Sequence, residues 1–225
     1  MNIDTSAKLS AALPVYLIVV ALLCLLLLGL VFRSILVPVQ AVVGYLLSVA
    51  ASLGVVTWIF QDGHLGGLIS IPATSPVVSF LPILLLGILF GLAMDYEVFL
   101  VSRIREEYTT TGDAAASVVE GYANSARVVA AGAAIIISVF ASFIFTQDLI
   151  VKSIGFTLAF GVLIDAFVVR MTLVPAALAV SRDAAWWLPR RIDRILPNLD
   201  IEGANLEEAG SGREQAPAVT GLGIQ

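Results

Sequence analysis

The stretch Gly87-Ile-Leu-Phe-Gly-Leu-Ala-Met-Asp-Tyr-Glu-Val-Phe-Leu-Val-Ser-Arg103 decides the fold, because it places a carboxylate inside a long apolar helix. Apolar residues lead from Val77 to Asp95 and continue past it to Ser102, so Asp95 lies well inside a membrane-spanning segment. An ionised side chain there costs at least ~2.5–3.5 kcal/mol on insertion scales. Residues kept at such a cost are usually functional, which indicates a role in moving protons or ions.

The composition is that of an integral membrane protein. Hydrophobic residues make up 59% of the chain and charged residues only 13%, whereas a soluble domain carries about 25% charge. The net charge of −5 gives no indication of nucleic-acid binding. The single cysteine, Cys24, lies in an apolar run and the single histidine, His64, in a Gly-rich loop. These counts exclude a disulfide framework and a Cys- or His-based metal site, and we expect no cofactor, with protons as the coupling ion.

Five apolar stretches are long enough to cross a bilayer core of roughly 30 Å as helices. They cover residues 13–32, 36–60, 77–102, 128–147 and 150–171. The joint Arg33-Ser34 is so short that the first two helices should form an antiparallel pair. The sequence therefore predicts an all-α integral membrane fold, with a five-helix transmembrane domain over residues 13–171.

The connecting segments are polar. Residues 1–12 are expected to be an extracytoplasmic remnant, and the Gly-, Pro- and Ser-rich residues 61–76 an exposed loop. Residues 103–127 form a longer polar connection, in which Asp113–Asn124 has the pattern of an amphipathic helix lying on the membrane surface.

Two further segments follow the last span. Residues 172–197 contain Trp186-Trp187 beside basic residues, which is typical of a cytoplasmic interface anchor. Residues 198–225 are acidic and rich in Gly and Ala, which predicts a disordered cytoplasmic tail.

The distribution of basic residues orients the bundle, because cytoplasmic loops carry an excess of Lys and Arg. One side has only Lys8 and Lys152. The other collects Arg33, Arg103, Arg105, Arg127, Arg182, Arg190, Arg191 and Arg194. The N-terminus is therefore expected outside and the C-terminus inside. An outside N-terminus without a signal peptide indicates the C-terminal portion of a longer protein, either excised from it or produced by a split gene.

Helical spacing places Gly87, Gly91 and Asp95 on one face of the third helix, with Phe99 following. The two glycines form a GxxxG step, which allows a neighbouring helix to approach closely. Tyr96 supplies a hydroxyl that can donate to the carboxylate or extend a hydrogen-bond chain. A carboxylic acid that is neutral or charged in turn can load and release a proton. The alternative is that Asp95 is only a structural hydrogen-bond partner between helices.

Two other acids are weaker candidates. Glu97 points away from Asp95 on the same helix and suits an interfacial ion pair better than a relay. Asp165 follows Gly161 with the same G-x-x-x-D spacing and lies only ~7–8 Å deeper than Arg170. We favour a snorkelling Asp165 that pairs with Arg170 or Arg127. Its functional alternative is a second acid on the inward proton path.

These residues resemble a known family. The segment GLAMDYEVFLVSRIREEY (residues 91–108) is similar to the signature of the MMPL (mycobacterial membrane protein large) family, within the RND superfamily of proton-driven exporters. LVFRSILVPVQAVVGYLLSV resembles the helix pair that follows the family's second extracytoplasmic domain. GFTLAFGVLIDAFVVRMTLVPAAL and AAWWLPRRIDRILPNLDIEG resemble the last helix and its cytoplasmic extension. The chain would then hold the last five helices of the second half of an RND-type bundle.

The resemblance implies a function. Asp95 and Tyr96 would form half of a paired Asp-Tyr proton relay, whose partner pair lies in the other half, and Leu92 and Phe99 would line the same central channel. The implied partners are the N-terminal half and the extracytoplasmic domains, the bilayer of a bacterial plasma membrane, and a lipid or hydrophobic small molecule as cargo. Energy would come from the inward proton gradient.

Two other classes of function remain as alternatives. An intramembrane aspartyl protease needs two carboxylates close enough to share a proton, usually in a Gly-x-Gly-Asp run, which neither Asp95 nor Asp165 has. A sterol-sensing-like structural bundle of the same superfamily would need no proton site, so the intact Asp-Tyr pair argues against it.

Overall fold

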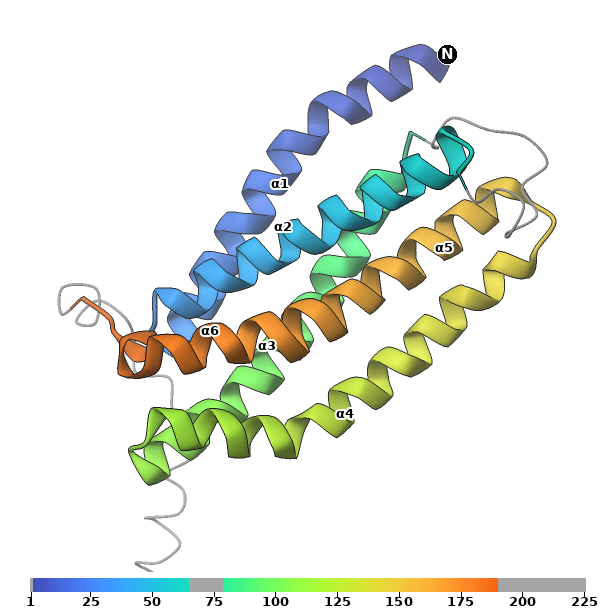
Figure 1. Cartoon of the computed structure of the whole chain (residues 1–225). Helices are drawn as coiled ribbons and strands as arrows, with labels where there is room; N and C mark the ends of the chain where they lie inside the picture. The colour runs from blue at the N-terminus through green and yellow to red at the C-terminus, as the bar shows by residue number, and fades with distance from the viewer. Residues whose placement is uncertain (1, 65–78, 190–225) are drawn as a thin grey trace, which may run out of the picture. The chain divides into compact units, whose positions relative to one another are not determined.

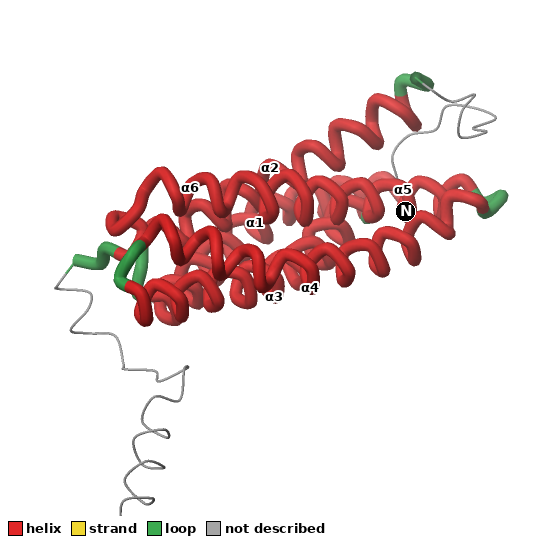
Figure 2. The backbone as a smooth tube through the Cα atoms, turned by 60° about the horizontal axis from the view of Figure 1, so that its bottom comes forward, coloured by secondary structure: helices red, strands yellow, loops and turns green. Residues whose placement is uncertain are grey.

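The computed structural model describes residues 2–64 and 79–189, and every regular element within them is a helix (Figure 2). The elements are α1 (Asn2–Phe32), α2 (Leu36–Val56), η1 (Thr57–Gln61), α3 (Leu81–Thr111), α4 (Ala114–Ser142), η2 (Phe143–Phe145), α5 (Leu149–Leu163), η3 (Ile164–Leu173), α6 (Val174–Ser181) and η4 (Arg182–Trp186). Five helical stretches in this part are long and apolar enough to cross a membrane. The prediction of an all-α membrane bundle is therefore confirmed. Residues 65–76 of the predicted loop and the tail from residue 190 lie outside the described residues.

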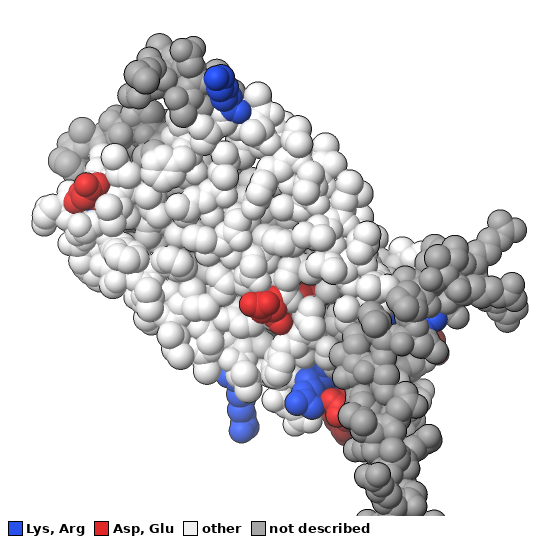
Figure 3. All heavy atoms as spheres, turned by 180° about the vertical axis from the view of Figure 1, so that it is seen from behind, with Lys and Arg blue, Asp and Glu red and all other residues white. Residues whose placement is uncertain are grey.

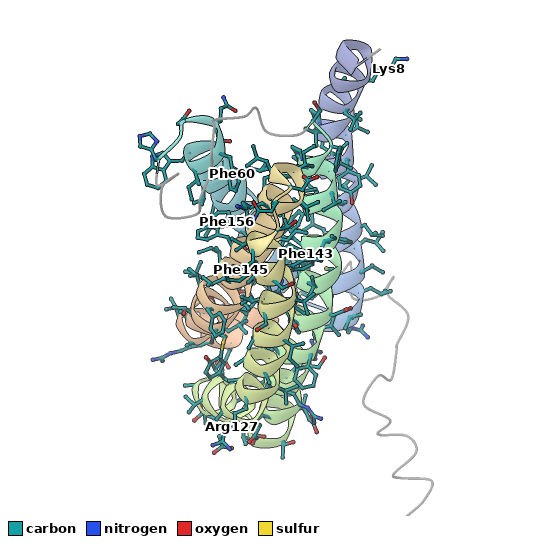
Figure 4. All side chains as sticks on the ribbon, turned by 90° about the vertical axis from the view of Figure 1, so that its right-hand side faces the viewer. Lys8, Phe60, Arg127, Phe143, Phe145 and Phe156 are labelled. Carbon is teal, nitrogen blue, oxygen red and sulfur yellow. The ribbon has the colours of Figure 1, made fainter. Side chains whose placement is uncertain are left out.

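The long helices run side by side and are joined at two ends, with α1 diverging from α2 towards the N-terminus (Figure 1). We call the end that carries the α1–α2 turn, the α3–α4 turn and η4 the basic end. At the α1–α2 turn, Arg33 adopts a left-handed conformation (φ 48°), and its N–H donates to Gly29 O at 3.1 Å. Lys8 and Arg127 lie at opposite ends of the bundle (Figure 4).

The first span is longer than predicted, because α1 is helical from Asn2, whereas the sequence placed the start at residue 13. The second span matches closely. There α2 continues without a break into the π-helical turn η1, which ends at Gln61.

The connection between the third and fourth spans differs from the prediction. A separate surface helix over Asp113–Asn124 is wrong, because these residues form the cap and first turns of the continuous helix α4. Likewise α3 runs on to Thr111. Gly112 ends α3 in a left-handed conformation (φ 70°), and its N–H donates to Tyr108 O at 2.9 Å. The Asp113 carboxylate then accepts from Ala115 N and Ala116 N, as an N-cap does.

Gly121 explains why residues 103–127 fold as a hairpin of two helices, because it lets α3 and α4 pack closely. A Cβ added to Gly121 of α4 would lie 2.7 Å from the Cα of Ile104 in α3, so the two backbones touch there. This close packing stabilises helix in both segments where polarity alone had indicated a surface connection.

The last helical stretch is also longer than the predicted span. Helix α5 passes into the π-helical segment η3, then α6, then the 3₁₀ turn η4. The helix therefore continues past Met171, and the end of the membrane span at residue 171 stays a prediction. Pro175 does not end the helix, because it stands in the first turn of α6, where its missing N–H costs little.

The buried apolar residues form three clusters along the bundle. The cluster at the basic end includes Leu28, Phe32 and Leu100. The middle cluster includes Leu86, Leu89 and Ala133. The cluster at the opposite end comprises Val56, Ile59, Phe60 and Leu81. The ring of Phe156 packs against that of Phe60 there, tilted by 55° with the ring centroids 5.8 Å apart (Figure 4).

Side chains at the basic end tie η4 to α3. The Tyr108 ring stacks on Trp186 with centroids 5.6 Å apart, and its hydroxyl donates to Asp183 Oδ1 at 3.1 Å. The Arg105 guanidinium lies over the Trp186 ring, 5.5 Å from its centroid. We call Arg105, Tyr108, Asp183 and Trp186 the aromatic clasp.

Candidate functional site

Helix α3 presents its acids on different faces. Asp95 is exposed, whereas Glu97 is only 1% exposed. Gly91 and Phe99 share the exposed face with Asp95, and Leu92 and Tyr96 are half-buried. Figure 3 shows acidic side-chain atoms surrounded by uncharged side chains in the middle of one face of the bundle, with the other charged side chains of that view towards its edges. Of the predicted alignment of Gly87, Gly91, Asp95 and Phe99, the last three residues face away from the helices of this chain, whereas Gly87 is half-buried.

The two glycines of the GxxxG step have different surroundings. A Cβ added to Gly87 would lie 3.3 Å from the Tyr16 hydroxyl of α1, whereas one added to Gly91 would meet nothing within 4 Å. Gly87 thus accommodates a helix of this bundle. Gly91 leaves open space one turn before Asp95.

The Tyr96 side chain packs against α4. A Cβ added to Gly132 would lie 3.0 Å from the Tyr96 hydroxyl, so the glycine makes room for it. Within the described part of the chain, neither this hydroxyl nor the Asp95 carboxylate makes a hydrogen bond. The structure thus leaves both polar groups of the Asp-Tyr pair without a partner inside this bundle.

A second cluster of charges lies buried between α2, α3 and η3. Arg170 donates from Nε to Asp165 Oδ2 at 2.8 Å and from a terminal nitrogen to Glu97 Oε2 at 2.7 Å. Ser48 donates its hydroxyl to Asp165 Oδ1 at 3.1 Å. We call Glu97, Asp165 and Arg170 the buried triad. Each of its three side chains is at most 3% exposed.

The triad corrects two predictions. Asp165 does pair with Arg170, but it does not snorkel to an interface, because it is 2% exposed. Glu97 is an ion-pair partner, but a buried one. No periodicity pointed to Ser48, which lies on α2. The one sequence feature that could have indicated a buried charge cluster was Glu97, a second acid on the face of the helix opposite Asp95.

Close helix packing brings the triad together. A Cβ added to Gly44 of α2 would lie 2.4 Å from Val169 Cγ1, and one added to Gly161 would lie 2.8 Å from Ser52 Oγ. Both glycines allow α2 to approach the last span on either side of the Ser48–Asp165 contact. Among residues 2–64 and 79–189, no group of three or more His, Cys, Asp and Glu side chains is placed to hold a metal ion.

Comparison with known proteins identifies the class. The profile of the MMPL family matches residues 2–196. The chain therefore belongs to the MMPL family, a family of membrane transporters. It is 48% identical over 206 residues to membrane protein YdfJ of Bacillus subtilis, a match that covers 92% of this chain and 28% of that protein.

Mycobacterial relatives match as well. The chain is 39% identical to the mycolic acid-containing lipids exporter MmpL11 of Mycolicibacterium smegmatis, over 88% of this chain and 21% of that protein. It is 31% identical to the trehalose monomycolate exporter MmpL3 of Mycobacterium tuberculosis, over 98% of this chain and 24% of that protein. The chain thus spans about a quarter of the length of these relatives.

Proposed function

We propose that this chain is part of a proton-motive-force-driven exporter of lipids or hydrophobic compounds, with Asp95 and Tyr96 as half of its proton relay. The observation that carries the proposal is the exposure of Asp95 near the middle of the apolar helix α3. A charged group facing hydrocarbon is unfavourable, whereas one facing a protein partner or a water-filled path is not.

The open space beside Asp95 supports the proposal that another helix of the transporter packs against α3 at this point. Since a Cβ at Gly91 would meet nothing within 4 Å, a helix from another part of the transporter can pack directly against α3. The exposed side chain of Phe99 extends the same surface. We propose that an equivalent helix of the N-terminal half, carrying its own Asp-Tyr pair, covers this surface.

We propose that the relay works as follows. A proton that enters from the extracytoplasmic side neutralises Asp95 and removes its attraction to polar groups of the other half. The two halves then shift relative to one another, and release of the proton to the cytoplasm resets them. In this scheme Tyr96 extends the hydrogen-bond path, and Leu92 and Phe99 line the channel.

The cargo and location are inferred from the relatives and the charge pattern. Two of the relatives are named as exporters of mycolic acid-containing lipids and of trehalose monomycolate, so we propose an amphipathic lipid or another hydrophobic compound as cargo. Extracytoplasmic domains outside this sequence would select it. We propose a bacterial plasma membrane location, with the arginine-rich end in the cytoplasm.

The test is Asp95→Asn in the full-length parent transporter, reconstituted in vesicles with an imposed proton gradient. Proton-coupled export should be abolished while expression and membrane insertion stay intact. Asp62→Asn is the matched control, because Asp62 is an exposed acid after η1 and undergoes the same chemical change. Unchanged export in Asp95→Asn would refute the relay and favour a structural bundle.

A further inference from the structure

A small cavity lies inside the bundle beside the buried triad. Its volume is ≈ 10 Å³, and α1, α2, α3 and η3 all contribute to its lining. The polar and sulfur-bearing side chains that line it are those of Cys24, Tyr45, Met94, Glu97 and Arg170. A cavity of this size is just large enough for one buried water molecule, provided that the water finds two or more polar partners.

One carboxylate oxygen of Glu97 lacks a partner. Oε2 accepts from Arg170, but Oε1 is buried without a hydrogen bond from any described residue. The Gln40 side chain lies within reach of Glu97, yet its amide nitrogen and oxygen are also buried and make no hydrogen bond of good geometry. An ionised oxygen without a donor is costly in such surroundings. Either a proton on this oxygen or a water beside it would remove the cost.

Asp165 differs from Glu97 in this respect. Its Oδ1 accepts from Ser48 and its Oδ2 accepts from Arg170, so both oxygens are satisfied in the charged form. Of the two acids that share Arg170, Glu97 is therefore the better place for a proton.

The charges around Glu97 lead to the same conclusion. Arg170 contributes one positive charge, and Glu97 and Asp165 contribute two negative charges when ionised. The other groups near them are uncharged: Gln40, Tyr45 and Ser48 from α2, the Cys24 thiol from α1 and the Tyr96 phenol from α3. One bound proton would make the cluster neutral, and a neutral cluster is favoured in the interior of a membrane protein.

We propose that Glu97, Arg170 and the adjoining cavity form a buried site for one exchangeable proton and one water molecule. The proton resides on Glu97 Oε1, and the resulting O–H group donates a hydrogen bond to the cavity water. The Tyr45 hydroxyl donates a hydrogen bond to Leu86 O at 2.9 Å, so its oxygen is free to accept a hydrogen bond from the cavity water. During loading the cavity water gives a proton to the Glu97 carboxylate and takes one from a hydronium ion outside the site, so that it remains a neutral water. Unloading reverses both transfers. The site does not depend on Asp95 or on the identity of the cargo.

Infrared spectroscopy of the 225-residue chain in lipid vesicles tests the proposal without a mutation. Wild-type protein at neutral pH should show the carbonyl stretch of a protonated carboxylic acid. Labelling the glutamate carboxyls with ¹³C should shift this band to lower frequency, and D₂O should shift it because the proton exchanges. Among the described residues Glu97 is the only buried glutamate, so the label assigns the band.

Variants give an independent check. Glu97→Gln should lose the ¹³C-glutamate band. Asp165→Asn should lose it too, because the remaining Glu97–Arg170 pair is neutral when Glu97 is ionised. Glu106→Gln is the control, since Glu106 is exposed in a surface pair with Arg103, and the band should remain. Absence of the band in wild type, a shift with ¹³C-aspartate alone, or its persistence in Glu97→Gln would overturn the proposal. The outcomes for the ¹³C-glutamate band do not bear on Asp95.

Discussion

Arg170 donates from Nε to Asp165 Oδ2 over 2.8 Å, although the two residues are five positions apart in one helix. In an α-helix residues five apart point about 140° away from each other. The pair forms because Ile164–Leu173 is π-helical, with hydrogen bonds from i to i+5. π-Helical turns are frequent at functional sites, and here the turn aims Arg170 at Glu97 on α3 as well. The last span and the helix that carries Asp95 are thus joined by a buried ion pair.

Removing Arg170 should destabilise the bundle strongly. Arg170→Met leaves the Asp165 carboxylate buried without its counter-charge and removes the hydrogen-bond donor to Glu97 Oε2. Breaking a buried ion pair from one side costs about 3–5 kcal/mol. Denaturant unfolding in lipid or detergent micelles measures the change in the free energy of unfolding. Arg103→Met is the matched control, because the Arg103–Glu106 pair is more than half exposed on both sides and such pairs contribute about 0–1 kcal/mol. Equal effects of the two substitutions would contradict the structural role of the triad.

Two glycines should respond differently to the same substitution. Gly121→Ala should lower the stability of this chain by about 1–3 kcal/mol, because the added methyl group meets the α3 backbone at 2.7 Å. Gly91→Ala should leave the stability unchanged or raise it slightly, since nothing lies within 4 Å and alanine favours helix. Thermal unfolding of the isolated chain distinguishes them.

Gly91 should nevertheless matter in the assembled transporter. If another helix packs on the Asp95 face, Gly91→Leu should reduce export by the full-length protein while the isolated chain still folds. Gly54→Leu is a suitable control, because a Cβ at Gly54 of α2 also meets nothing within 4 Å. Full export by the Gly91→Leu transporter would argue against a partner helix at this face.

The aromatic clasp should hold η4 against α3. Trp186→Ala removes the stacking on Tyr108 and the contact with Arg105, so backbone amides of Arg182–Trp186 should exchange faster in hydrogen–deuterium exchange. Trp187→Ala provides the comparison, because Trp187 is 62% exposed. Protection that survives Trp186→Ala, or is lost equally in Trp187→Ala, would show that other contacts secure this turn.

The sequence was sufficient to predict the number and type of the spans, because uncharged runs of this length have few folds open to them in a membrane. It did not predict where helices end beyond the apolar runs. Polarity marked residues 103–127 as a surface connection, but α3 and α4 remain helical there because Gly121 lets their backbones touch. That contact joins residues on two different helices, so no local pattern reveals it.

The sequence likewise predicted one part of the candidate site and missed another. Helical spacing grouped Gly87, Gly91, Asp95 and Phe99. The last three lie on one exposed face, whereas Gly87 is half-buried beside Tyr16 of α1. Helical spacing could not reveal the buried triad, because the Asp165–Arg170 spacing fits a π-helix and not an α-helix, and Ser48 comes from another helix. The role of the Asp-Tyr pair as a proton relay stays a prediction.

The most direct measurement is a titration of the Asp95 carboxyl in the full-length transporter. Infrared spectra of ¹³C-aspartate-labelled protein, with the spectrum of Asp95→Asn subtracted, isolate this one group over a range of pH values. Our account predicts that Asp95 gains and loses a proton between the pH values found on the two sides of the membrane. A single, fixed charge state at every accessible pH would contradict it and leave Asp95 as an inert polar contact between helices.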